Sequence, residues 1–261
     1  MGENVQRQLW FMWIYYLHLF HILCNCTFSL LNKRYNWRHD TVLSTFEPFI
    51  RERLRKQNEL KEIKRELKQT GFITFVRAGA KPNPPIKKST NLDTILCGAN
   101  DWVVRFDYDS APAMFPEVIC ATDFRPDIVI WSQSTKTVII GEQTIPAEEN
   151  VADAHNRKAT KYESLIASCI SQGWRTTLFP FEIGCKGFVG FSFYKFCKKL
   201  GFLKRAIRDI SKTLSKVALR CSYLIYLSRN NQNWKPLNLC IISSNSESET
   251  LDPDDALLGV T

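Results

Sequence analysis

The sequence predicts an α/β protein built around one main domain. Its 261 residues are 44% hydrophobic and 23% charged, which is enough for one sizeable core and unlike a disordered chain. Two short runs rich in β-branched residues, 128–131 and 137–140, flank a polar turn, as in a hairpin of two buried strands. Segments with the periodicity of amphipathic helices lie on both sides of this hairpin. Helices before and after a buried hairpin are typical of α/β folds.

Before the hairpin, the sequence predicts one long helix and two strands. Asp40 or Thr41 can cap the start of the helix, which carries apolar residues on one face and ends at Gly71. The runs 72–76 and 102–108 are typical of strands, because β-branched and aromatic residues dominate them.

After the hairpin, the sequence predicts a helix, a strand and a second long helix. The first helix spans 148–171 and stops near Gly173, and the strand spans 175–183. Pro180 places this strand toward an edge or a bulge of the sheet, because proline cannot donate a ladder hydrogen bond. Apolar residues repeating at intervals of three and four predict an amphipathic helix over 203–224.

Two acids interrupt the apolar hairpin at its open end. Asp127 opens the first strand and Glu142 ends the second, so the hairpin brings two carboxylates to one edge of the sheet. Burying two like charges is costly unless something positive lies between them. A divalent cation meets this need, and Mg²⁺ is typically held by one or two carboxylates plus water and phosphate oxygens. We therefore expect Asp127 and Glu142 to bind Mg²⁺ or Mn²⁺.

The pattern Pro126-Asp127 followed by Glu142-Gln143-Thr144 resembles the PD-(D/E)XK nuclease superfamily. The resemblance implies an αβββαβ core, here with basic C-terminal helices, and a metal-dependent nuclease. It departs from the family at one position, because Thr144 stands where the family has its catalytic lysine. Lys158 or Lys161 on the following helix could take that role.

Strand and helix geometry distinguishes these two lysines. Glu142 lies roughly 13 Å before Pro146, and about ten residues of a helix running back over the sheet return to that level. Lys158 is at this level if the helix starts near Glu148, and it lies within the apolar stripe that faces the sheet, whereas Lys161 lies at its border. We expect Lys158 to be the catalytic lysine. The alternative is that both lysines only extend from a surface helix into solvent.

Further segments resemble the restriction-like endonuclease of non-LTR retrotransposons. They are YNWRHD, FVRAGAKP, RPDIVIW, E-x-T-x-P, AHNRKATKYESL and GWRTTLFPFEIGCKGFVG, in this order, within residues 21–229. The resemblance implies a DNA endonuclease from the C-terminal end of a retroelement polyprotein, without the reverse transcriptase that normally precedes it. The expected partner is DNA, with element RNA or a separately supplied reverse transcriptase as further candidates, and the expected location is the nucleus.

Positive charge is concentrated near the C-terminus. The net charge is +9, and between residues 186 and 235 the basic side chains are opposed only by Asp209. A basic stripe on an amphipathic helix can neutralise phosphates, and its alternative is an ordinary solvated face. The residues expected to bind DNA are Lys198, Lys199, Lys204, Arg205 and Arg208.

The composition and the resemblance together imply four segments of the chain. A leader with an incomplete zinc-knuckle remnant covers 1–34, the nuclease core covers 35–185, a basic helical extension covers 186–240, and a disordered acidic tail covers 241–261.

The leader does not have the features of a membrane anchor or a secretion signal. Its apolar run is short and interrupted by polar residues, so neither a membrane span nor secretion is expected. His21 and Cys26 have the spacing of the second half of a zinc knuckle, but no CxxC pair precedes them, so we expect no zinc site from this chain alone. The nine cysteines form no CxxC pair, which favours a reduced intracellular setting.

Five further polar residues are weaker candidates, each with a structural alternative. Glu47 could be an accessory metal ligand or a solvated acid, and Asp107 and Asp109 could be site acids or turn residues. Arg38 and His39 could contact a phosphate or help the chain enter the helix.

The sequence leaves two functions open. The first is a metal-dependent DNA endonuclease, favoured by the retained acid pair. The second is a catalytically inactive nucleic-acid-binding module derived from a retroelement, favoured by Thr144 and by the missing upstream domain.

Overall fold

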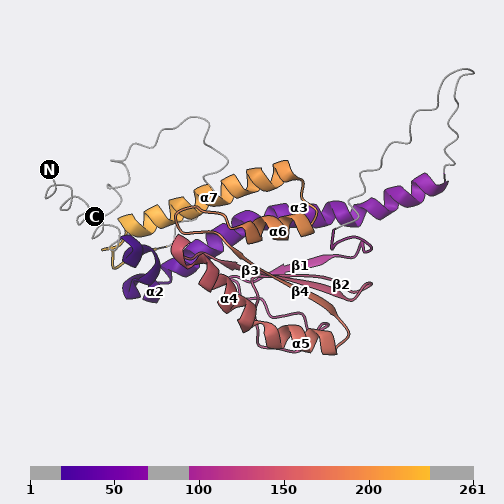
Figure 1. Ribbon diagram of the computed structural model, residues 1–261, viewed down its shortest axis with the longest axis horizontal. Helices are drawn as coiled ribbons and strands as arrows, with labels where there is room; N and C mark the ends of the chain where they lie inside the picture. The colour runs from indigo at the N-terminus through magenta and orange to yellow at the C-terminus, as the bar shows by residue number, and fades with distance from the viewer. Residues whose placement is uncertain (1–18, 70–93, 236–261) are drawn as a thin grey trace, which may run out of the picture.

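The computed structural model describes residues 19–69 and 94–235, and for residues 60–69 it describes the backbone alone. Its centre is a four-stranded sheet with helices on both faces (Figure 1). The predicted α/β class is confirmed. The predicted strand over 72–76 and the helix end at Gly71 lie outside the described residues, as does the acidic tail.

The sheet has its strands in sequence order. These are β1 (Val103–Phe106), β2 (Ile128–Ser132), β3 (Thr137–Thr144) and β4 (Arg175–Glu182). β1, β2 and β3 pair antiparallel, whereas β4 runs parallel to β3. The predicted hairpin is confirmed as β2 and β3. β4 lies at the edge of the sheet, where its Pro180 is tolerated, as the sequence predicts.

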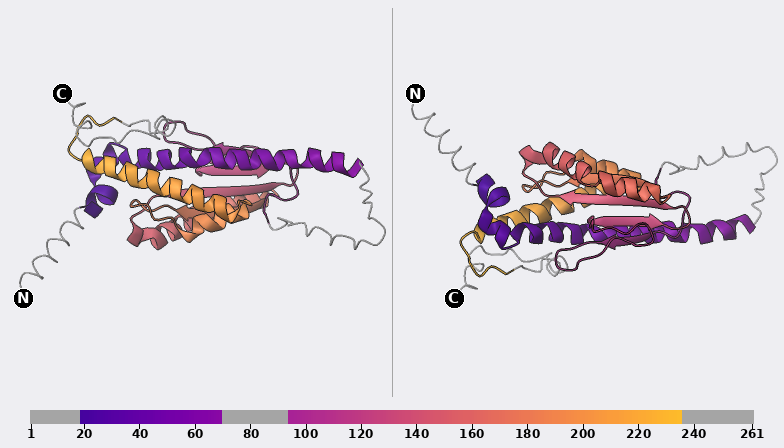
Figure 2. Two further views of the ribbon diagram at one scale, coloured as in Figure 1. Left: turned by 90° about the horizontal axis from the view of Figure 1, so that it is seen from above. Right: turned by 90° about the horizontal axis from the view of Figure 1, so that it is seen from below.

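Alternating side chains of the central strands β2 and β3 belong to two hydrophobic clusters, one on each face of the sheet. Ile128, Ile130 and Ile139 belong to one cluster, while Val129, Val138 and Ile140 belong to the other. Both strands are apolar on both faces because helices cover both sides of the sheet. Figure 1 shows the sheet between these two layers of helices, and Figure 2 shows the two helical faces from above and from below.

The first layer consists of α3 (Arg34–Gln69), α6 (Phe191–Lys199) and α7 (Lys204–Leu227). Buried residues of all three helices form one cluster with the sheet, in which Phe46 of α3 lies against Phe181, Phe193 and Phe196. The basic helical extension is therefore part of the same core as the strands. α7 has the amphipathic pattern expected of it, with buried Ile207, Ile210 and Leu214.

The predicted start of α3 is wrong. The helix begins at Arg34, so Asp40 and Thr41 lie inside it rather than at its N-terminus. Thr41 Oγ1 donates to the carbonyl oxygen of Trp37 one turn earlier, and Asp40 Oδ2 accepts from the backbone N–H of Asp109. The earlier start is fixed by tertiary contacts, because the buried Arg34 guanidinium donates to the carbonyl oxygens of Ser228 and Asn231 beyond α7.

The second layer is the predicted helix over 148–171, divided into three pieces. A short 3₁₀ turn, η2 (Glu148–Asn150), leads into α4 (Val151–Lys161), and α5 (Glu163–Ser171) follows after a break at Tyr162. Tyr162 is fully buried and has φ −101° and ψ 7°, outside regular helix geometry. Gly173 ends the segment with φ 81°, the left-handed conformation that glycine adopts readily.

Within residues 21–31, two short helical turns precede α3. These are the π-helical turn η1 (His21–Asn25) and α2 (Thr27–Leu31). Ile22 and Leu23 of η1 pack with Ile225 of α7 and with Cys185, which follows β4. A search of the described helices finds none with the length and apolar character needed to cross a membrane.

Candidate functional site

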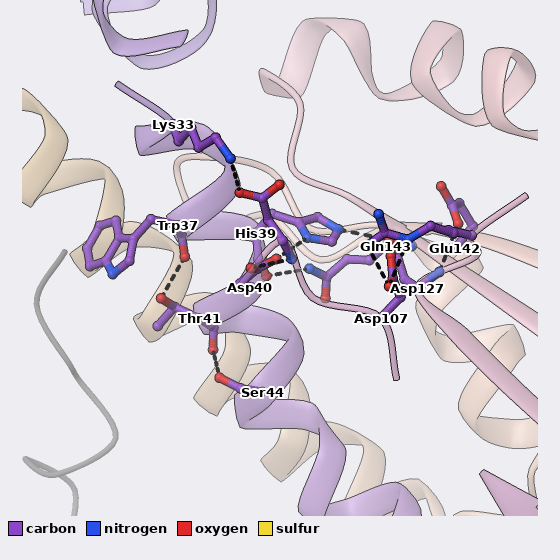
Figure 3. Close-up of polar contacts among 12 residues, drawn as sticks. Lys33, Trp37, His39, Asp40, Thr41, Ser44, Asp107, Asp127, Glu142 and Gln143 are labelled. Carbon is purple, nitrogen blue, oxygen red and sulfur yellow. Dashed lines mark hydrogen bonds and ion pairs between the residues drawn. The ribbon is translucent and has the colours of Figure 1, made fainter. Parts of the chain in front are cut away.

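The hairpin brings Asp127 and Glu142 together at the open end of β2 and β3. Asp127 Oδ2 accepts from the backbone N–H of Gln143 at 2.6 Å, and the backbone N–H of Asp127 donates to Glu142 Oε2 at 3.2 Å. Both side chains are buried, and the Glu142 residue is 1% exposed. Each carboxylate is therefore fixed by the backbone of the other strand (Figure 3).

The helix α4 places Lys158 against this pair. Lys158 Nζ lies 2.5 Å from Glu142 Oε1, whereas Lys161 Nζ lies 3.8 Å from the same oxygen and donates to Tyr162 Oη at 2.9 Å. The Lys158 side chain is 24% exposed and that of Lys161 46%. This is the relative placement that the strand and helix geometry predicts. The catalytic role of either lysine stays a prediction.

His39 of α3 lies between two carboxylates. Its Nε2 is 3.2 Å from Asp127 Oδ2, and its Nδ1 is 3.2 Å from Asp40 Oδ1 (Figure 3). Burial alone would lower the pKa of His39, but the charges and hydrogen bonds of Asp127 and Asp40 outweigh burial and raise this pKa to about 10. His39 is therefore an imidazolium at neutral pH.

Each acid of the hairpin thus has a cation as a neighbour. Burial and then the charge of Asp127 raise the pKa of Glu142, while Lys158 and Lys161 act in the opposite direction. His39 faces Asp127 from the α3 layer, and Lys158 faces Glu142 from the α4 layer. These two contacts offset the cost of holding two carboxylates in an apolar sheet.

An open pocket of about 890 Å³ begins at this end of the sheet. Its wall combines acids with cations. The acids are Asp40, Asp107, Asp109, Asp127 and Asp153, and the cations are Arg38, His39, Arg125, Arg157 and Lys158. The Arg125 side chain is 38% exposed, and Arg157 is also exposed. A charged ligand can therefore reach Asp127 and Lys158 from solvent.

Two oxygens beside the carboxylates have no hydrogen-bond partner among the described residues. They are Gln143 Oε1 and Thr144 Oγ1, and both are buried. Gln143 uses its other amide atom, because Nε2 donates to the carbonyl oxygen of His39 at 3.0 Å. Gln143 is not among the site residues that the sequence predicts, and its signal in the sequence is its position between Glu142 and Thr144.

The weaker candidates from the sequence, apart from His39, have their side chains bound to residues other than the two hairpin acids. Asp107 accepts from Arg125 at 2.7 Å, Asp109 accepts from Lys33 at 2.9 Å, and Glu47 binds Arg51 and Tyr108 without lining the pocket. The Arg38 guanidinium is nearly fully buried and donates to Ser222 Oγ and the carbonyl oxygen of Ile145. Of these five residues, the structure brings His39 into contact with the hairpin acids.

A third buried carboxylate lies at the same edge of the sheet. Glu182 ends β4 opposite Thr144 and is 2% exposed. Its two oxygens bind His155 Nδ1 at 2.8 Å and Ser192 Oγ at 2.5 Å. These contacts join α4, β4 and α6, so Glu182 links the two helices to the edge strand.

The residues expected to bind DNA are exposed but far from the acid pair. All five lie at the end of α6 or the start of α7, namely Lys198, Lys199, Lys204, Arg205 and Arg208. Gly201, between these helices, lies against Arg53 of α3, and the axis of α3 rises about 21 Å from His39 to Arg53. α6 and α7 also belong to the opposite layer from Lys158 (Figure 1).

The carboxylates of Asp127 and Glu142 are the oxygen donors at the hairpin that could hold a hard divalent cation. The unpaired Thr144 Oγ1 is on the same strand face as Glu142, whereas the unpaired Gln143 Oε1 is on the opposite face. No group of three or more His, Cys, Asp or Glu side chains within residues 19–59 and 94–235 is arranged for a metal. Two protein carboxylates, with water and phosphate as the remaining ligands, match the preference of Mg²⁺ rather than that of Zn²⁺.

Comparison with known proteins assigns no family to this arrangement. None of the models of known protein families matches the chain, and no curated protein is significantly similar to it.

Proposed function

We propose that this chain is a metal-dependent DNA endonuclease with a PD-(D/E)XK core, derived from a non-LTR retrotransposon. The observation that carries the proposal is the contact of Lys158 Nζ with the buried Glu142 carboxylate, beside Asp127. Lys158 and Asp127 both line the open pocket. One or two carboxylates can hold a divalent metal, and a neighbouring lysine can stabilise the charge that develops on a phosphate. The expected substrate is DNA, and the expected location is therefore the nucleus.

The arrangement of elements supports this family. α3, the antiparallel strands β1 to β3, the α4–α5 segment and the parallel strand β4 follow one another in the order expected of an αβββαβ core. The acids lie at the end of the second and third strands, where the family has its own. A mixed α/β sheet alone is compatible with many functions. The proposed chemistry therefore depends on the two acids and the lysine rather than on the fold.

Asp127 and Glu142 would hold Mg²⁺ or Mn²⁺ between them. When bound, the metal supplies Lewis-acid stabilisation of the charge that develops on the phosphate and lowers the pKa of a coordinated water. The backbone hydrogen bonds from Gln143 to Asp127 and from Asp127 to Glu142 keep one oxygen of each acid in place. Asp127 Oδ1 remains available for the cation or its waters, whereas Glu142 Oε1 is in contact with Lys158, which would have to turn toward the phosphate when the metal binds.

Lys158 takes the role of the lysine that is absent from position 144. Its ammonium reaches the carboxylate from α4, on the side of the sheet opposite α3. Directed toward a bound phosphate, this charge stabilises the transition state and orients the attacking water. Lys161, at 3.8 Å from Glu142, contributes a second and weaker positive charge.

His39 positions Asp127. Its protonated ring donates to Asp127 Oδ2 and is held on its other side by Asp40. His39 belongs to α3, and the next turns of this helix pack into the core through Val42, Leu43 and Phe46. His39 therefore keeps the carboxylate in one orientation, which a metal ligand needs.

DNA would contact the protein at two places. At the pocket, the exposed side chains of Arg125 and Arg157 can meet phosphates next to the cleaved bond. Away from the pocket, the basic residues at the end of α6 and the start of α7 would meet phosphates farther along the duplex or another nucleic acid, such as the element RNA.

An inactive nucleic-acid-binding module is the second candidate. The observation that favours it is that His39 and Lys158 already neutralise the acids, so the site is electrostatically satisfied without a metal. Nicking of supercoiled DNA distinguishes the two functions. The endonuclease predicts nicking in Mg²⁺ or Mn²⁺ that EDTA stops, whereas the module predicts DNA binding without nicking under either metal.

A further inference from the structure

A pair of thiols lies at another part of the pocket wall. Cys24 of η1 and Cys185, which follows β4, are 161 residues apart in the sequence, yet their sulfurs are 3.5 Å apart. Both are free thiols. Disulfide sulfurs lie about 2.0 Å apart, so the two atoms need to approach by about 1.5 Å to bond.

The two sulfurs differ in their access to solvent. Cys24 is partly exposed and lines the pocket, whereas Cys185 is fully buried and packs with Ile22, Leu23 and Ile225. A small oxidant that enters the pocket can therefore reach Cys24 first. Cys185 is then the nearest thiol, already in contact with the sulfur that has reacted.

The charges around Cys24 favour its thiolate. A hydrogen bond with Cys185 and the positive charge of Arg38 lower the pKa of Cys24 to about 7, although burial acts in the opposite direction. The same hydrogen bond and burial raise the pKa of Cys185. Because the thiolate is the nucleophilic form, Cys24 is the attacking sulfur and Cys185 the resolving thiol.

The protein also contains a natural comparison for this pair. Cys120 and Cys169 have their sulfurs 3.7 Å apart, but both are buried beside Trp174 and Leu165 beneath α5. Burial raises the pKa of Cys169 to about 12. Because both sulfurs are buried and the pKa of Cys169 is raised, we expect this second pair to react more slowly than the first.

We propose that Cys24 and Cys185 form a disulfide when the protein meets a peroxide. The Cys24 thiolate attacks one peroxide oxygen, the O–O bond breaks, and the products are a sulfenic acid on Cys24 and, after protonation, water or an alcohol. The Cys185 thiol then attacks the Cys24 sulfur, the S–O bond breaks, and a second water leaves with the thiol proton. The two sulfurs together lose two electrons, and these reduce the O–O bond.

The disulfide would tie the N-terminal turn η1 to the edge of the pocket. The backbone N–H of Cys185 donates to the carbonyl oxygen of Pro146, two residues after the end of β3. The link would therefore join η1 to the segment that follows Glu142. This inference does not depend on nuclease activity, because the thiols and the peroxide are its only reactants.

Peptide mapping of the full chain after treatment with hydrogen peroxide tests the proposal. Trypsin cleavage after Arg7, Lys33, Arg175 and Lys186 gives one peptide with Cys24 and another in which Cys185 is the single cysteine. We expect a disulfide between these peptides in treated protein, its disappearance on reduction, and a higher unfolding temperature of the oxidised protein. Cys120 and Cys169 should remain reduced at the same peroxide concentration.

Two variants make the result specific. Cys24→Ser should abolish the linked peptide, while Cys26→Ser, two residues away in the same peptide, should keep it. Circular dichroism and the unfolding temperature check that each variant is folded. The proposal is overturned if Cys24 accumulates as a sulfinic acid without the link, if the link persists in folded Cys24→Ser, or if Cys120 and Cys169 join equally fast.

Discussion

Lys158 Nζ and Glu142 Oε1 are in contact across the space between α4 and the end of β3. The acid is almost completely buried, and the lysine reaches it from a separate element with its own side chain partly exposed. In the proposed nuclease, Lys158 on α4 would act in place of a lysine two residues after Glu142, where this chain has Thr144. Variants of Lys158, Lys161 and Thr144 can therefore test which side chain acts as the catalytic lysine.

Removing Lys158 should reduce cleavage more than removing Lys161. We expect Lys158→Ala to lower the rate of DNA nicking by about 100-fold or more, the scale of losing one charge partner of the transition state. Lys161→Ala should have a smaller effect, because its ammonium is 3.8 Å from Glu142 and more exposed. Single-turnover nicking rates of the two variants measure the difference. Equal rates for Lys158→Ala and the wild type would show that Lys158 is not catalytic.

A lysine at position 144 should partly replace Lys158. Thr144 and Glu142 are two residues apart on β3, so their side chains lie on the same face of the strand. We expect Thr144→Lys to recover part of the nicking rate in the Lys158→Ala background and to help little in the wild type, where two ammonium groups would compete for one place. The matched variant Thr144→Gln tests whether length without charge suffices. If it restores the same activity, the recovery does not come from the positive charge.

The pairing of His39 with Asp127 should make the stability of the metal-free protein depend on pH. The pKa of His39 is about 10 in the folded chain and about 6.5 in an unfolded chain. A raised pKa contributes stability that is fully present below about pH 6.5 and is lost as the pH rises through about 10. In EDTA, the difference in unfolding free energy between the wild type and His39→Gln should therefore shrink from neutral to alkaline pH. A constant difference would mean that His39 is neutral in the folded protein.

Local sequence patterns account for the parts of the fold that depend on neighbouring residues. The β-branched runs on either side of a polar turn predict β2 and β3. The acids at the ends of these runs predict that Asp127 and Glu142 lie together, and a hydrogen bond from the Asp127 backbone N–H to Glu142 Oε2 joins them. The position of Lys158 follows from the rise of a helix over a strand. These predictions succeed because strand alternation and helix periodicity are set by residues close together in the chain.

Long-range contacts account for the parts that the sequence analysis missed. α3 starts at Arg34 because that buried side chain binds carbonyl oxygens beyond α7, nearly the full length of the described chain away. The contact of His39 with Asp127 spans 88 residues. The break at Tyr162 reflects the burial of one ring against Phe124 and the sheet. No local pattern encodes contacts of this kind.

The basic residues at the end of α6 and the start of α7 should contribute to DNA affinity but little to the chemical step. Replacing Lys198, Lys199, Lys204, Arg205 and Arg208 with Gln should weaken binding to all sequences alike. The slope of log affinity against log salt should fall by about one unit for each phosphate that the variant no longer neutralises. Lys136→Gln, in the turn between β2 and β3, serves as the control. A slope unchanged in the multiple variant would exclude this surface from DNA binding.

The rate of supercoiled-DNA nicking by Asp127→Asn and Glu142→Gln in Mg²⁺, beside the wild type, tests the metal-bound acid pair most directly. Each change removes one anionic oxygen and nearly preserves side-chain volume, so the variants should fold and bind DNA much like the wild type. The account predicts EDTA-sensitive nicking by the wild type and no nicking by either folded variant. Full, EDTA-sensitive nicking by both variants would contradict it and would place the catalytic site elsewhere.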